Sequence, residues 1–176
     1  MAWWRERLEA LDTGLDAPAE PRLRAVQTEL VPCRVSGTEL SRLEDGWLPL
    51  LEPFPWGEAV AEGLKLRGRI LFGIGARLLG GNAGDAEAAG ALWSLVDGAR
   101  HCSDLHSRMV LLEQARAAIR ELPKARPPKV LRRLTSLAAM AAHDALRNRQ
   151  PELPYFGAKR GMAALLHYIL GTFPQA

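Results

Sequence analysis

The chain has 176 residues, of which 48% are hydrophobic and 24% are charged, and its formal net charge is +3 at pH 7. This composition is typical of a single globular domain with a sizeable core, and so mild a charge favours an anionic partner only weakly. No apolar run reaches the roughly 18 residues that a membrane-spanning helix needs. The two cysteines, Cys33 and Cys102, form no C-x-x-C pair and suggest no disulfide framework, which fits a reducing cytoplasm. The charged, amphipathic start MAWWRERLEAL is unlike a signal peptide.

Apolar residues recur at helical spacing along the chain, and no stretch alternates with the period of a strand. The sequence therefore predicts an all-α fold. We expect helices over residues 2–11, 21–31, 36–50, 56–79, 86–108, 109–122, 130–148 and 162–173. Glycine and proline mark the loops 12–19, 124–128 and 151–157, and Ser36 with Glu39 forms a capping box.

Three glycines, Gly68, Gly73 and Gly75, lie inside the predicted helix 56–79. They do not form a phosphate-binding loop, because no strand precedes them and their spacing is wrong. Close packing of helices, or access for a ligand, explains them better.

The stretch 86–108 carries a polar cluster on an otherwise apolar helix. Its apolar residues form one stripe: Ala89, Leu92, Trp93, Val96 and Ala99. Asp97, His101 and Asp104 follow at i, i+4 and i+7, so a continuous helix would project all three to a common face. Gly90 and Gly98 indicate close packing or ligand approach, since glycine costs a helix about 1 kcal/mol relative to alanine.

This stretch resembles the second aspartate motif of squalene/phytoene synthases, the head-to-head prenyl transferases of the all-α isoprenoid synthase fold. Gly90, Leu95 and Arg100 match the motif. His101 stands where the first metal-binding aspartate is usual, and Asp104 falls one residue before the second.

The resemblance extends along most of the chain. Residues 2–8 resemble the W-W-R segment of the family, and residues 68–81 resemble the small-residue helix before the second motif. Arg108 and Leu111 keep part of the G-R-x-Y-L-P segment, and Arg116 begins a stretch like that of bacterial members. The order and spacing agree from Trp3 to about Arg147.

The resemblance implies that residues 1–176 form one domain, a shortened isoprenoid (terpenoid) synthase-type bundle that lacks the family's N-terminal helices. It implies a side that faces a prenyl diphosphate, made by Asp97, Arg100, His101, Asp104 and Arg108. It also implies a prenyl channel lined by Gly68, Phe72, Gly73, Gly75 and Trp93.

Two departures from the family concern its chemistry. The first aspartate motif lies upstream of W-W-R in the family, and this chain contains none of it. Asp12 and Asp16 satisfy D-x-x-x-D but follow that segment, so we interpret them as part of a loop. The family's Mg²⁺ ions need carboxylates from two facing helices, and His101 offers a nitrogen better suited to zinc or copper.

The polar cluster leaves its role open. Asp97, His101 and Asp104, with Asp144 from another helix, could hold a metal other than magnesium. Alternatively, Arg100, His101 and Asp104 form hydrogen bonds in a remodelled cavity or at a helix end. Mg²⁺ is expected only if the chain is an active enzyme.

Two functions follow from the resemblance. We predict a catalytically degenerate family member that acts as a binding or assembly protein, as does a mitochondrial respiratory complex I assembly factor that shares the fold. The alternative is a prenyl transferase of isoprenoid, carotenoid or hopanoid biosynthesis, completed by the missing helices or by a partner chain.

The remaining features bear on partners and location. Seven basic residues cluster between positions 116 and 133: Arg116, Arg120, Lys124, Arg126, Lys129, Arg132 and Arg133. We interpret them as a solvated face and expect no nucleic acid, since no stacking aromatics lie between them.

The apolar helix 162–173 is expected in the core or over an exposed edge, with peripheral membrane contact as the alternative. Trp3 and Trp4 predict self-association, and we expect a cytoplasmic location.

Overall fold

The computed structural model describes residues 2–147 and 157–174, and every regular element in these ranges is a helix. The prediction of an all-α fold is therefore confirmed, while most of the predicted loop 151–157 lies outside the described residues. The longer helices are α1 (Ala2–Leu11), α4 (Glu58–Leu78), α5 (Gly84–His101), α6 (Leu105–Arg120), α7 (Arg132–Arg147) and α8 (Ala158–Leu170). The short ones are α2 (Pro21–Ala25), η1 (Val26–Leu30), η2 (Val31–Cys33), α3 (Gly37–Ser41), η3 (Leu48–Leu51) and η4 (Lys129–Leu131).

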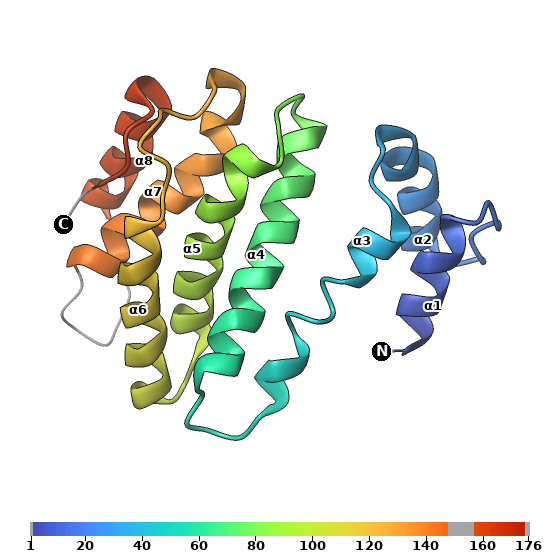
Figure 1. Ribbon diagram of the computed structural model, residues 1–176, viewed down its shortest axis with the longest axis horizontal. Coiled ribbons are helices and arrows are strands. Elements are labelled where there is room, and N and C mark those ends of the chain that lie inside the picture. Colours follow the sequence, from blue (N-terminus) through green and yellow to red (C-terminus); the bar gives the residue numbers. More distant parts are fainter. Residues whose placement is uncertain (1, 148–156, 175–176) are drawn as a thin grey trace.

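Helix α5 lies at the centre of the bundle and contacts α4, α6 and α7, while α8 packs against α7 (Figure 1). The core between these helices includes fully buried large side chains and many alanines, with Leu64, Phe72, Leu92, Leu95 and Leu111 as its largest members. Burial of these apolar groups is the main term that stabilises the arrangement.

Helices α4 and α5 approach each other closely where they cross, at Gly68 and Gly90. A Cβ atom added to Gly68 would lie 2.1 Å from the carbonyl oxygen of Gly90, and one added to Gly90 would lie 2.1 Å from that of Gly68. The two backbones thus pack directly on each other. About two turns further along α5, a Cβ on Gly98 would lie 2.6 Å from a methyl group of Leu64. Packing between helices therefore explains these three glycines.

The N-terminal segments pack on the opposite side of α4 from α5 (Figure 1). Their contact with α4 is a small apolar cluster around Val35, Ile70 and Ile74. Arg77 on α4 forms an ion pair with Glu39 on α3, which ties the two segments together. Arg5 on α1 pairs with Glu44 at 2.9 Å, so α1 is fixed to the turn that follows α3.

Two predicted helices differ from those in the structure. The segment 36–50 forms only α3, a run of turns and η3, although Ser36 does cap α3 by accepting a hydrogen bond from the Glu39 amide at 3.0 Å. The predicted helix 21–31 continues instead through η1 and η2 to Cys33 and stops at Arg34, whose φ of 62° is left-handed.

The predicted continuous helix 86–108 is also wrong. Helix α5 ends at His101, the backbone is extended at Cys102, and α6 begins at Leu105. Asp104 is the residue that starts α6, because its carboxylate accepts a hydrogen bond from the Ser107 amide at 2.7 Å. Asp97, His101 and Asp104 consequently do not lie on one helical face.

Asp12 holds the start of α3 in place. Its carboxylate accepts hydrogen bonds from the Gly37 amide at 2.6 Å, the Thr38 amide at 2.8 Å and the Thr38 hydroxyl at 2.7 Å. Burial alone would raise the pKa of Asp12, but these hydrogen bonds from Thr38 and Gly37 together lower it. Asp16 is exposed in the loop, so the two residues share no site, as the loop interpretation predicted.

Replacing Asp12 with alanine is expected to lower the free energy of unfolding by about 1 kcal/mol at pH 7, the usual cost of a lost helix cap. A carboxyl group whose pKa is lower in the folded state stabilises the fold at pH values above its pKa in the unfolded chain. This stabilisation is lost as the pH falls through the pKa of the group in the folded state. Urea unfolding at several pH values should therefore show the parent and the variant converging below about pH 4. Asp16→Ala is the control and should change stability by less than about 0.5 kcal/mol; a loss equal to that of Asp12→Ala would contradict the capping role.

Candidate functional site

An apolar pocket of about 590 Å³ lies where η3 and the segment after it meet α4 and α5. Its lining is Trp47, Leu50, Leu51, Trp56, Leu64, Arg67, Asp97, Gly98 and His101. Two indole rings and three leucines form most of the wall, and among the described lining residues only Arg67, Asp97 and His101 are ionisable. A pocket of this size with few polar groups is typical of sites for small organic ligands.

Arg67, Asp97 and His101 form the polar end of the pocket. Arg67 is the most buried of the three, with a side chain that is 7% exposed. Its guanidinium donates hydrogen bonds to Asp97 Oδ2 and to the Ser94 hydroxyl, both at 3.1 Å. The same group lies 4.3 Å from the ring centroid of Trp47, within the range of a cation–π contact. Burial lowers the pKa of Arg67, and the carboxylate of Asp97 acts in the opposite direction.

His101 is the exposed group of the polar end. Its Nδ1 lies 2.8 Å from the backbone oxygen of Asp97 and 3.6 Å from the carboxylate of the same residue. Because a carbonyl oxygen only accepts, Nδ1 carries the proton and Nε2 of the neutral ring is an acceptor. The positive charge of Arg67 and the negative charge of Asp97 cancel, so the polar end has no net charge while His101 is neutral.

Only Asp97 and His101, of the five residues predicted to face a diphosphate, line this pocket. Arg100 donates to the buried carboxylate of Asp144 on α7 at 2.7 Å. Asp104 caps α6, and its hydrogen bonds from Ser107 lower its pKa. Arg108 donates to the carbonyl oxygen of Cys102 at 2.7 Å, within the connection between α5 and α6.

A magnesium cluster does not fit this donor set. In residues 2–147 and 157–174 no group of three or more His, Cys, Asp or Glu side chains is placed to hold a metal ion. Asp97 is the only carboxylate in the pocket lining, and it is already paired with Arg67. Mg²⁺ needs several oxygen ligands in octahedral geometry, which one paired carboxylate does not provide.

The residues predicted to line a prenyl channel lie at helix contacts instead. Gly68 is at the crossing of α4 and α5, and a Cβ on Gly75 would lie 3.2 Å from Leu134 on α7. Phe72 is fully buried and its ring packs on that of Trp93, with centroids 5.6 Å apart. A Cβ on Gly73 would meet Ala83 at an ordinary 3.5 Å. None of the five is part of the lining of the apolar pocket.

Sequence reasoning missed most of the residues that form the pocket. Trp47 and Leu50 fall within the predicted continuous helix 36–50, which the structure replaces by α3, turns and η3. Arg67 is not among the predicted site residues. The signal that could have identified it is a charged side chain beside Gly68, inside an apolar helical pattern.

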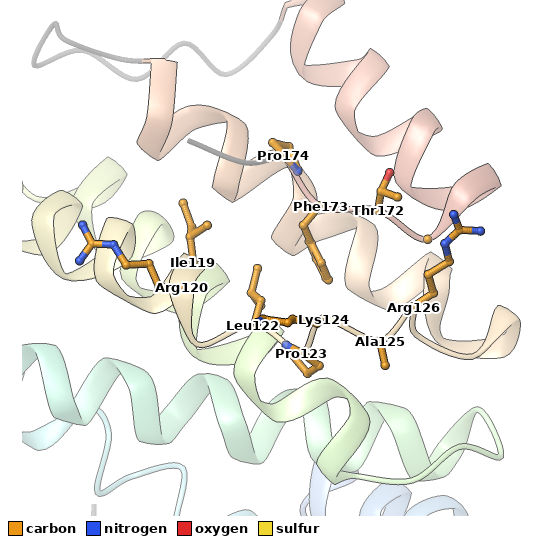
Figure 2. A pocket seen from close by; sticks show the side chains of 11 residues that line it. Ile119, Arg120, Leu122, Pro123, Lys124, Ala125, Arg126, Thr172, Phe173 and Pro174 are labelled. Atoms are coloured by element: carbon orange, nitrogen blue, oxygen red, sulfur yellow. The ribbon is translucent and has the colours of Figure 1, made fainter.

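A second pocket, of about 420 Å³, lies between the end of α6 and residues 171–174. Figure 2 shows the Phe173 ring directed toward Leu122 and Pro123, while the Arg120 guanidinium points away from it. Arg126 lies on the other side of Phe173 in this view. The side chains of Arg120 and Arg126 do not converge on one point, so a bound anion would not contact both. This pocket is therefore a weak candidate for an anion-binding site.

Comparisons with known proteins give no relative: no protein-family model, no curated protein and no solved structure matches the chain. The family resemblance therefore stays a prediction. The fold and site define a helical protein with an apolar pocket that ends at a partly buried, neutralised ion pair. The described residues contain no helix long and apolar enough to cross a membrane.

Proposed function

We propose that this chain is a squalene/phytoene synthase-like protein of the isoprenoid synthase type that binds an isoprenoid chain without magnesium-dependent catalysis. In this role it serves as a binding or assembly protein. The observation that carries the proposal is the apolar pocket at Trp47, Trp56 and Leu64, whose polar end holds one ion pair and, among the described residues, no set of metal ligands.

The wall of the pocket favours a branched apolar chain. Indole and leucine side chains offer contact surface to methyl and methylene groups, and each buried CH₂ contributes about 0.8 kcal/mol. Trp47 and Leu51 are 48% and 74% exposed. A bound chain would therefore remove apolar surface of the protein from water as well as its own.

The polar end favours a ligand with a neutral head group. A diphosphate carries several negative charges, and the Arg67–Asp97 pair offers no excess positive charge to balance them. A hydroxyl group can donate to the Asp97 carboxylate or to Nε2 of His101. An isoprenoid alcohol thus matches the pocket better than a diphosphate does.

The alternative remains a prenyl transferase. It is favoured by one observation, which is that Asp97 and His101 from the predicted diphosphate side do line the apolar pocket. Such an enzyme needs further carboxylates from outside the described residues or from a partner chain. The prenyl transferase interpretation also requires that a diphosphate bind only with Mg²⁺. The interpretation with a neutral head group has no such requirement.

Replacing Trp47 with alanine is expected to weaken binding of farnesol by about tenfold or more, because the indole forms one wall of the pocket and covers Arg67. Calorimetric titration of the purified chain measures the dissociation constant. Trp3→Ala is a matched control, since Trp3 is 44% exposed against 48% for Trp47 and lies on α1 away from the pocket. Unchanged affinity in Trp47→Ala, or an equal loss in Trp3→Ala, would contradict the assignment.

A further inference from the structure

Helix α8 is fixed to the bundle by one side only. Ala163 and His167 form its buried face against α7. The His167 ring lies 2.7 Å from the Thr135 hydroxyl through Nε2 and 3.0 Å from the carbonyl oxygen of Thr172 through Nδ1. These contacts set the rotation of the helix about its axis and determine which side faces outward.

The outward side of α8 is a continuous apolar stripe. Met162, Leu165, Leu166 and Ile169 follow at i, i+3, i+4 and i+7, and they are 52%, 49%, 46% and 57% exposed. The expectation that the segment 162–173 lies in the core is therefore wrong for most of its large side chains. The other placements, over an exposed edge or in peripheral membrane contact, stay predictions. An exposed stripe of this kind marks a surface that meets another apolar phase.

Basic side chains flank the stripe. A groove of about 330 Å³ runs beside α8, and its lining includes Met162, Leu166 and Phe173 together with Arg147 and Lys159. Among the residues that the structure describes, this lining contains no acidic side chain. The surface therefore presents apolar side chains beside a positive rim.

We propose that α8 is a membrane-docking helix that lies flat on an anionic lipid surface. Met162, Leu165, Leu166 and Ile169 would enter the boundary between head groups and acyl chains. Arg147 and Lys159 would meet the lipid phosphates. The inference is independent of the proposed isoprenoid ligand, because it uses none of the pocket residues.

A second copy of the chain fits this surface less well. A symmetric dimer places the same patch on both subunits, so among the described lining residues it would offer Arg147 and Lys159 no acidic partner. An anionic lipid surface is complementary to the rim and to the stripe at once.

The test is co-sedimentation of the full chain with vesicles at low salt. With equimolar phosphatidylcholine and phosphatidylglycerol we expect a vesicle-bound fraction at least about tenfold above that with phosphatidylcholine alone, and we expect added salt to release it. Ile169→Glu should lose at least about tenfold in affinity for the anionic vesicles, because a charge enters the apolar boundary. Met109→Glu, on α6, is the matched control at 60% exposure and should bind like the parent.

Three outcomes would overturn the proposal. The first is equal binding to neutral and anionic vesicles, and the second is equal affinity of Ile169→Glu and Met109→Glu. The third is a dimer in sedimentation velocity that Ile169→Glu dissociates, since this result would assign the stripe to a second copy. Circular dichroism of both variants establishes that each is folded.

Discussion

Replacing Gly68 with alanine is expected to destabilise the chain by about 3 kcal/mol, the upper end of the range for overpacking a close contact. The added Cβ would lie 2.1 Å from the Gly90 oxygen and 2.5 Å from the Gly90 carbonyl carbon. Both atoms belong to the backbone, so the strain is relieved only if α4 and α5 move apart. That movement opens the centre of the core, and its cost exceeds the roughly 1 kcal/mol that alanine adds to helix stability.

Gly73→Ala on the same helix provides the control. Its Cβ would meet Ala83 at 3.5 Å, an ordinary van der Waals contact. Urea unfolding followed by circular dichroism should show Gly73→Ala equal to the parent, or more stable by up to about 1 kcal/mol. If both variants lose the same stability, or Gly68→Ala loses none, the close crossing of α4 and α5 is contradicted.

Replacing Asp144 with alanine is expected to destabilise the fold by about 3–5 kcal/mol, the cost of breaking a buried ion pair from one side. The Asp144 side chain is 2% exposed, and its Oδ2 accepts hydrogen bonds from Arg100 at 2.7 Å and from Arg160 at 2.8 Å. The two guanidinium groups would lose the carboxylate that they share. Since these residues come from α5, α7 and α8, the variant should loosen three helices together.

The matched comparison is Glu113→Ala. Glu113 also pairs with an arginine, Arg116 at 2.8 Å, but its side chain is 76% exposed. An exposed pair of this kind contributes less than about 1 kcal/mol. Thermal or urea unfolding that ranks Asp144→Ala no lower than Glu113→Ala would contradict the structural role of the buried carboxylate.

The positions of the long helices could be predicted because they depend on local patterns. The predicted range 2–11 coincides with α1 (Ala2–Leu11), and the range 56–79 lies within two residues of α4 (Glu58–Leu78). The break between α5 and α6 was missed because periodicity continues through it. The apolar pattern of the sequence continues past Asp104 and so gives no sign of the cap, whose hydrogen bonds start α6.

The pocket could not be predicted in the same way, since it depends on tertiary packing. Trp47 and Asp97 lie far apart in the chain and meet only because η3 packs on α4 and α4 crosses α5. The outward face of α8 was missed for a related reason. An apolar helical pattern identifies a face that avoids water, but it does not say whether the rest of the chain covers that face.

The neutral-head interpretation of the pocket is tested most directly by isothermal titration calorimetry of the purified chain. The ligands are farnesol and a non-hydrolysable farnesyl diphosphate analogue, each titrated with and without Mg²⁺. We predict that farnesol binds with the same affinity in both conditions and that Mg²⁺ does not strengthen binding of the analogue. Binding of the analogue that requires Mg²⁺ would contradict the proposal and favour the prenyl transferase, and no binding of farnesol in either condition would contradict the isoprenoid pocket itself.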